Sequence, residues 1–225
     1  ILLQDDPLDA TSTWSVTQRL QSSDIAPADG FGLVVSLSGS TLAVSAYEDD
    51  DNGDFSGSVY VFVRSNPANR TSVWVQAHKL LPSRGSANEG FGVTVALNGN
   101  VLVAAAAWAT TDAVKTGYAA VFVRTNGTDV AAPWNETTIL YPADTTVANQ
   151  FLGAYSSFRG EVLGITTGNF FLYLYDVTQP LDADGAPDVT LREVGHMPVR
   201  SPYAGVSTTV VPIVSGTNLI DIRRT

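Results

Sequence analysis

The chain has 225 residues, 44% of them hydrophobic and 15% charged, so it can bury a sizeable core and lacks the composition of a disordered protein. Its net charge of -10 argues against nucleic acid and anionic membrane surfaces as partners, because both select clustered Lys and Arg. The absence of cysteine excludes thiol catalysis, disulfides and cysteine-based zinc sites, and no apolar run is long enough for direct membrane insertion. The start, Ile1-Leu2-Leu3-Gln4, has no initiator Met and no signal-like pattern, so we expect a processed product or a piece of a longer chain.

The first strong pattern along the chain is a stretch that occurs twice. Residues 30–46, GFGLVVSLSGSTLAVSA, return 60 positions later as residues 90–106, GFGVTVALNGNVLVAAA. The same offset aligns two further sets, Trp14 with Trp74 and Trp134, and Phe31 with Phe91 and Phe151. Self-similarity at this period predicts a propeller, an array or a solenoid.

Each unit divides into four short β runs separated by turn residues. In the first complete unit we predict strands over 31–37, 41–46, 58–64 and 73–80. The first two are apolar at nearly every position, as in strands covered on both faces, whereas the fourth alternates like an outer strand. Four antiparallel strands make one blade, so the predicted fold class is an all-β propeller of four-stranded antiparallel blades.

The predicted blades lie at about 31–80, 91–140 and 151–195. Residues 14–20 are predicted as the outer strand of a preceding blade, with no first three strands before it. Residues 203–224 are predicted as an abbreviated final blade, in which 216–223 align with the third strand at 57–64. Either the two ends pair and close a small ring of four blades, or the chain is an arc of a larger propeller, which we favour.

These units resemble the FG-GAP repeat found in integrin α-subunit propellers and in many surface proteins. The resemblance rests on Phe31-Gly32 and Phe91-Gly92, on the TLAVSA and VLVAAA strands, and on the stretch GSVYVF at 57–62. It implies about seven blades and a role in adhesion or assembly. The family's calcium loop lies between the first and second strands, where this chain has turns without Asp, so that site is not carried over. Ala46-Tyr47 and Ala106-Ala107 also stand where the family has Ala-Pro.

One acidic loop offers oxygen ligands elsewhere. Glu48, Asp50, Asn52 and Gly53 match the first positions of an EF-hand-like loop, but its twelfth position is Val59, so the bidentate carboxylate is missing. We predict a solvated surface loop, with weak Ca²⁺ binding at Glu48, Asp50 and Asn52 as the alternative and no other cofactor.

No pattern predicts a catalytic residue. His78 and His196 have no nucleophile or metal ligand at short spacing, and His78 falls at an exposed position of an outer strand. No Gly-x-Ser-x-Gly elbow, phosphate loop or carboxylate pair occurs. We therefore do not expect an enzyme.

Aromatic residues fall into a repeating set and one exception. Trp14, Trp74 and Trp134 begin outer strands, which favours packing between blades over sugar stacking. Trp108 has no repeat partner and is predicted either to contact a partner or to pack locally. The predicted partner-contact residues are Trp108 and the acidic loop residues Glu48, Asp49, Asp50, Asp51 and Asp54.

Three N-x-[ST] sequons begin at Asn69, Asn126 and Asn135, which we predict to be glycosylated. They fall in or just after loops that join third and fourth strands, and these loops leave one face or the outer rim of a propeller. Glycans there would leave the opposite face, with the acidic loop and Trp108, open to partners.

Together these features predict a non-enzymatic β-propeller module of a larger extracellular or cell-surface glycoprotein. It would serve adhesion, protein contact or structural assembly, with protein partners or neighbouring subunits. The alternatives are a lectin-like propeller that binds glycans through Trp108 and the acidic loop, and the non-catalytic domain of a secreted hydrolase.

Overall fold

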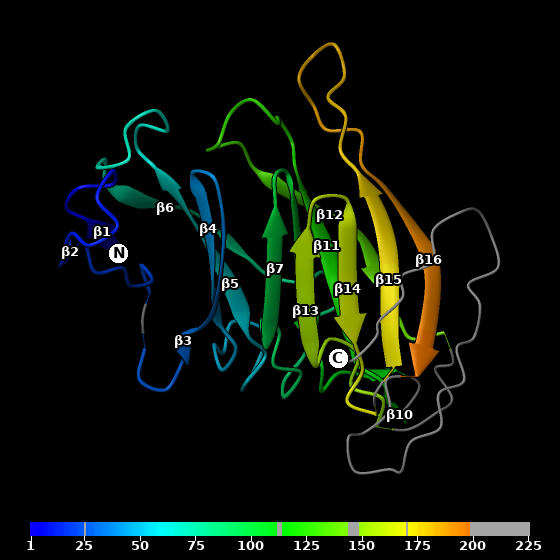
Figure 1. Cartoon of the computed structure of the whole chain (residues 1–225). Helices are drawn as coiled ribbons and strands as arrows, with labels where there is room; N and C mark the ends of the chain where they lie inside the picture. Colours follow the sequence, from blue (N-terminus) through cyan, green and yellow to red (C-terminus); the bar gives the residue numbers. More distant parts are fainter. Residues whose placement is uncertain (25, 112–113, 144–148, 170, 199–225) are drawn as a thin grey trace.

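The computed structural model describes residues 1–24, 26–111, 114–143, 149–169 and 171–198, and in these segments every regular element is a β-strand. Three antiparallel four-stranded sheets follow one another along the chain (Figure 1). The first sheet contains β3 (Phe31–Ser38), β4 (Thr41–Ala46), β5 (Ser58–Arg64) and β6 (Trp74–Leu80). The second contains β7 (Thr94–Asn98), β8 (Val101–Ala106), β11 (Tyr118–Arg124) and β12 (Trp134–Leu140). The third contains β13 (Tyr155–Arg159), β14 (Val162–Thr166), β15 (Phe171–Thr178) and β16 (Thr190–Pro198).

Strands within each sheet are neighbours in sequence order, as in a propeller blade. The predicted all-β class with four-stranded antiparallel sheets is therefore confirmed. A two-stranded hairpin, β9 (Thr110–Thr111) with β10 (Val114–Lys115), extends from the second sheet between β8 and β11. In the part of the chain that the structure describes, no helix is long and apolar enough to span a membrane.

The central strands explain the apolar runs of the sequence. Every residue of β4 and β8 is buried, because a sheet packs on each face of these strands. The first strand of the first sheet differs from the prediction: Leu33, Val35 and Leu37 of β3 are exposed. Nothing in the described residues covers that face of β3, whereas the corresponding β7 lies between two sheets.

A second hairpin stands before the first sheet. β1 (Leu2–Gln4) pairs with β2 (Trp14–Val16), so the predicted outer strand at 14–20 is shorter and does have a preceding partner. The pairing of Leu2 with Val16 and of Gln4 with Trp14 repeats, 60 residues earlier, the pairing of Phe62 with Gln76 and of Arg64 with Trp74. Hence β1 and β2 correspond to the third and fourth strands of a sheet.

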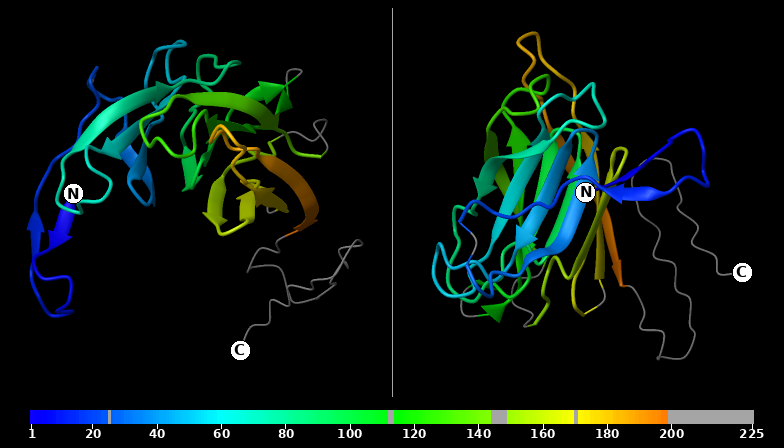
Figure 2. Two further views of the ribbon diagram at one scale, coloured as in Figure 1. Left: turned by 90° about the horizontal axis from the view of Figure 1, so that it is seen from above. Right: turned by 90° about the vertical axis from the view of Figure 1, so that its left-hand side faces the viewer.

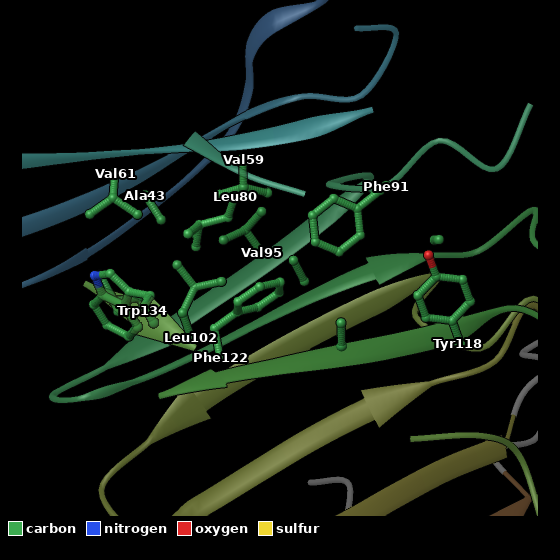
Figure 3. Close-up of a cluster of buried hydrophobic side chains, with 14 of the residues drawn as sticks. Ala43, Val59, Val61, Leu80, Phe91, Val95, Leu102, Tyr118, Phe122 and Trp134 are labelled. Atoms are coloured by element: carbon green, nitrogen blue, oxygen red, sulfur yellow. The ribbon is translucent and has the colours of Figure 1, made fainter. Parts of the chain in front are cut away.

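The sheets stand face to face along a curved arc, with the hairpin β1–β2 at one end and the third sheet at the other (Figure 2). One buried cluster joins the first and second sheets: Val95 and Leu102 point toward Ala43 and Val61, with Trp134 beside them (Figure 3). A second cluster joins the second and third sheets around Val103, Leu152 and Ile165. Core side chains therefore lie between sheets, and each sheet depends on its neighbours for burial.

The junction between sheets is a backbone contact. The Phe91 amide donates to the Ser56 carbonyl at 2.8 Å, and the Leu152 amide donates to the Thr116 carbonyl at the same distance. Leu152 thus occupies the place of Phe91, so the alignment of Phe151 with Phe91 is wrong. Gly92 and Gly153 confirm the shift, since both adopt nearly the same positive φ, 92° and 91°. The extra residue of the third unit lies before this junction.

Each fourth strand carries an irregularity that the sequence pattern did not predict. His78 pairs with Val61 while Gln76 pairs with Phe62, so Ala77 is an extra residue, or β-bulge. The second and third sheets have a bulge at Thr137 and Val194 in the same way. The predicted abbreviated blade at 203–224 lies outside the described residues.

Candidate functional site

The acidic loop between β4 and β5 turns one of its carboxylates inward. Asp49 is only 4% exposed, and its Oδ2 accepts hydrogen bonds from the Tyr60 hydroxyl at 2.8 Å and the Ser58 hydroxyl at 3.1 Å. Ser58 and Tyr60 are two residues apart in β5, so their side chains lie on the same face of the strand. Asp49 is therefore held by the sheet and does not face solvent.

Lys79 of β6 reaches the same carboxylate. Its Nζ lies 2.7 Å from Asp24 Oδ2, 3.0 Å from Asp49 Oδ2 and 2.7 Å from Asp51 Oδ2. The ammonium also lies over the Tyr60 ring, 5.1 Å from its centroid. Because Asp24 belongs to the segment between β2 and β3, this cluster ties the entry segment, the acidic loop and the outer strand of the first sheet together.

The charges of this cluster perturb one another. Burial by itself would lower the pKa of Lys79, but hydrogen bonds to Asp24, Asp51, Tyr60 and Asp49 outweigh burial and raise the pKa. The Lys79 hydrogen bond, followed by that of the Tyr60 hydroxyl, lowers the pKa of Asp24. Burial raises the pKa of Tyr60. The lysine and Asp24 therefore both stay charged near neutral pH, which suits an ion pair and gives no general acid or base.

The other loop residues are placed differently. Asp50 Oδ1 accepts the Phe55 amide at 2.8 Å, and Asp50, Asn52 and Asp54 are exposed, while Glu48 is half-buried. Among the described residues, no three His, Asp or Glu side chains are arranged to hold a metal ion. Weak Ca²⁺ binding at Glu48, Asp50 and Asn52 stays a prediction, and the positive charge that the structure places at this loop is the Lys79 ammonium.

Trp108 packs against the backbone of its own repeat. A Cβ added to Gly90 would lie 2.3 Å from the Trp108 ring, and Tyr47 covers Gly30 in the same way at 2.7 Å. The two aromatic rings also contact each other, with centroids 6.0 Å apart. Tyr47 is thus the spatial counterpart of Trp108, one position earlier in the repeat, and this local packing accounts for the glycine at both sites.

The sequons sit in different surroundings. Asn69 and Asn135 are exposed, and Asn126 is half-buried. The Asn69 side-chain oxygen accepts the amide and hydroxyl of Thr71 at 3.0 and 2.8 Å. Asp9, which cannot carry an N-glycan, accepts the same two bonds from Thr11 at 2.8 and 2.7 Å. The bonds therefore report the turn of the loop and carry no information about glycosylation.

Loops that join third and fourth strands leave the upper edge of Figure 1, as the β15–β16 loop shows, and β10 lies at the lower edge. The sequence predicted this division. His78, expected at an exposed position, is half-buried, and its Nε2 lies 2.9 Å from the Ala131 carbonyl oxygen of the neighbouring loop. His196 lies 3.0 Å from Glu193 and stacks on Tyr173.

The two ends of the arc expose apolar side chains whose counterparts are buried. Trp14 is 62% exposed, whereas Trp74 is 5% exposed and Trp134 is packed between sheets. At the opposite end, Val162 is exposed while its counterpart Val101 is completely buried. Each end face therefore has the chemistry of a surface between sheets, and none of the sheets that the structure describes lies against it.

The sequence can now be compared with known families. A family model described as the FG-GAP repeat matches residues 14–62 and 74–122. The chain contains FG-GAP repeats. Each matched segment begins at the outer strand of one unit and ends within the third strand of the next sheet, so one FG-GAP repeat of sequence spans a junction between sheets. No curated protein matches the chain.

The Lys79 cluster was missed because its members come from three separate segments. Tyr60 and Lys79 are directly paired across β5 and β6, but only the register shows this. A lone lysine in a predicted outer strand was the available signal, and it does not indicate which carboxylates will surround it.

Proposed function

We propose that this FG-GAP chain is a non-enzymatic β-propeller module of an extracellular surface or matrix glycoprotein, which serves adhesion, protein contact or structural assembly. The observation that carries the proposal is the pair of apolar end faces, because exposed apolar area of this kind marks a contact surface. The sheets form part of a larger propeller of about seven blades.

The architecture supports assembly rather than catalysis. FG-GAP repeats are associated with β-propeller modules of adhesion proteins. The charged groups that converge in the first sheet are paired with one another in ion pairs around Lys79. The lower edge of the sheets carries the acidic loop and Trp108. Asp49 and Asp51 bind Lys79 there, which leaves Glu48, Asp50 and Asp54 as the carboxylates of the proposed contact surface.

The extracellular part of the proposal rests on the sequons. We expect glycans at Asn69 and Asn135, which are exposed, and at Asn126 near the same loops. Sugars on that side would keep partners to the opposite edge. Expression in secretory eukaryotic cells, followed by intact mass before and after glycosidase, tests this: a loss of one to three glycan masses supports the proposal.

Asn69→Asp is the matched variant for this experiment. It removes the sequon but keeps the turn, since Asp9 already makes the same bonds in the homologous loop. We expect one glycan fewer and an unchanged melting temperature. A chain secreted without any glycan would contradict the glycoprotein assignment, and chelator-sensitive binding on a glycan array would favour the lectin-like alternative instead.

A further inference from the structure

Three Asn-Gly pairs occur in the chain, beginning at Asn52, Asn98 and Asn126. This dipeptide is chemically labile, because glycine has no side chain to keep its amide nitrogen away from the asparagine carboxamide. The nitrogen can attack the carboxamide carbon and close a succinimide ring, provided that the carboxamide is free to rotate toward it. Each pair is therefore a candidate modification site whose fate depends on how the structure holds the asparagine side chain.

Two of the three side chains are held by hydrogen bonds. Asn98 is half-buried at the end of β7, and its Nδ2 donates to the Gly160 carbonyl of the third sheet. Asn126 is also half-buried, and its Oδ1 accepts the amide and the hydroxyl of Thr128 at 2.9 and 2.7 Å. Neither carboxamide can rotate toward the following amide without losing these bonds.

The Asn52 side chain is different. It is exposed, and its carboxamide makes no hydrogen bond to any residue that the structure describes. The backbone amide of Asn52 donates to the Ser56 hydroxyl at 3.0 Å, which fixes the backbone and leaves the side chain free. Its Nδ2 lies against Gly85, where an added Cβ would come within 2.7 Å of it, so no side chain at that position restrains the carboxamide.

The attacking nitrogen is restrained alike at all three sites. Each glycine amide donates one hydrogen bond: Gly53 to the Asp50 carbonyl at 2.9 Å, Gly99 to the Ser38 hydroxyl at 3.0 Å, and Gly127 to the Gly185 carbonyl at 2.7 Å. Because this restraint is common to the three pairs, the freedom of the carboxamide is what distinguishes Asn52 from the other two.

We infer that Asn52 is a site of spontaneous deamidation, which adds a carboxylate to the acidic loop of the native protein. The Gly53 nitrogen forms a bond to Asn52 Cγ and loses its proton, while Nδ2 leaves as ammonia. Water then opens the succinimide at either carbonyl, which gives aspartate or isoaspartate. The new charge lies between Asp50 and Asp54, two carboxylates of the proposed contact surface. The reaction consumes only water, so it needs no enzyme or partner and goes beyond the proposed function.

The two products should affect the fold differently, because this loop contacts the segment that leads into the second sheet. The Asn88 amide donates to the Asp54 carbonyl at 2.7 Å, and the Gly90 amide donates to the Phe55 carbonyl at 2.9 Å. Isoaspartate inserts an extra carbon atom into the backbone just before these contacts, whereas aspartate leaves the backbone unchanged. The isoaspartate form should therefore be the less stable of the two.

Peptide mapping tests the site on the full-length chain, produced without glycans and kept near neutral pH. Asn52 should be modified roughly fivefold or more faster than Asn98 and Asn126, since each side-chain hydrogen bond that must break slows attack by about that factor. The matched control is the same chain in urea, where the three pairs lose their structural differences and should react at similar rates. Equal native rates would overturn the inference. An equal lead of Asn52 in urea would also overturn it, because local sequence and not the fold would then set the rate.

Two variants at the same position complete the test. Asn52→Gln keeps a neutral carboxamide but moves its carbon away from the Gly53 nitrogen, so the acidic form that accumulates in wild type on isoelectric focusing should disappear. If this form accumulates at the wild-type rate in Asn52→Gln, the charge arises elsewhere and the inference fails. Freshly purified Asn52→Asp carries the charge on an unaltered backbone. The isoaspartate fraction of aged wild type should unfold at a lower denaturant concentration than this variant, and equal midpoints would contradict the effect on the junction.

Discussion

The backbone of Phe91 lies directly on Gly57. A Cβ at Gly57 would come 2.1 Å from the Phe91 carbonyl oxygen, and Gly57 also has a φ of +83°. The same contact recurs where Leu152 meets Gly117. The glycine before β5 and the glycine before β11 are therefore the points at which the next sheet contacts the preceding one.

Gly57→Ala should accordingly be severe. The positive φ costs about 1 kcal/mol and the overlap with fixed backbone about 2 kcal/mol more, so we expect a loss of about 3 kcal/mol in the free energy of unfolding. Gly39→Ala is the control, because its φ is also positive, +57°, but nothing lies within 4 Å of the added carbon. Chemical denaturation measures both, and equal losses would contradict the junction.

Gly32 and Gly92 have the same backbone geometry, so they also test whether contact with a neighbouring sheet is what requires glycine. Both have a φ of +92°, but a Cβ at Gly92 would meet the Ser58 carbonyl oxygen at 2.9 Å, while at Gly32 it would meet nothing. We expect Gly92→Ala to cost about 1 kcal/mol more than Gly32→Ala, since only one has a sheet against it. Chemical denaturation of the two variants measures this difference, and equal losses would contradict the contact between the sheets at Gly92.

Lys79→Met should destabilise the first sheet by about 2 kcal/mol at pH 7. It leaves the buried Asp49 without its cation, although Asp24 and Asp51 are partly exposed and screened by water. Lys115→Met, on the exposed β10, removes the same charge and should change stability little. Comparable losses in thermal melts of the two variants would contradict the cluster.

The same variant has a predicted pH dependence. The folded pKa of Asp24 lies below its ordinary value of 3.8, so this group adds stability above about pH 4 that is lost as the pH falls through the folded pKa. The raised pKa of Lys79 keeps its contribution at high pH until beyond 10.5. The difference between wild type and Lys79→Met should therefore be constant from pH 5 to pH 9 and shrink below about pH 4.

Trp108→Ala tests whether the Trp108 side chain stabilises the fold by local packing or serves only to contact a partner. Because the ring covers Gly90 and contacts Tyr47, its loss should cost about 2 kcal/mol, less than for a fully buried tryptophan since Trp108 is 38% exposed. Leu8→Ala, at an exposed loop tip, should cost almost nothing. An unchanged unfolding midpoint for Trp108→Ala would favour partner contact alone.

The repeat could be recognised from sequence because turn glycines and apolar strands recur at a fixed offset. That pattern predicted the strands at 41–46 and 58–64 with correct bounds. It did not predict the bulges at Ala77, Thr137 and Val194, because one extra residue in an alternating strand changes no residue type. It also misplaced Phe151, since the aromatic residue matched Phe91 while the buried position had passed to Leu152.

The sequence by itself determined the unit of this protein: four short strands, a turn glycine, and a glycine before the third strand, all of which are local requirements of backbone geometry. Only the tertiary structure decided what each unit is stacked against. The same side-chain chemistry is buried at Trp74 and Val95 and exposed at Trp14 and Val35, because burial in a stacked array is set by the neighbouring sheet and not by the residue. The convergence of Asp24, Asp49 and Asp51 on Lys79 likewise depends on how a loop, a strand and an entry segment fold together.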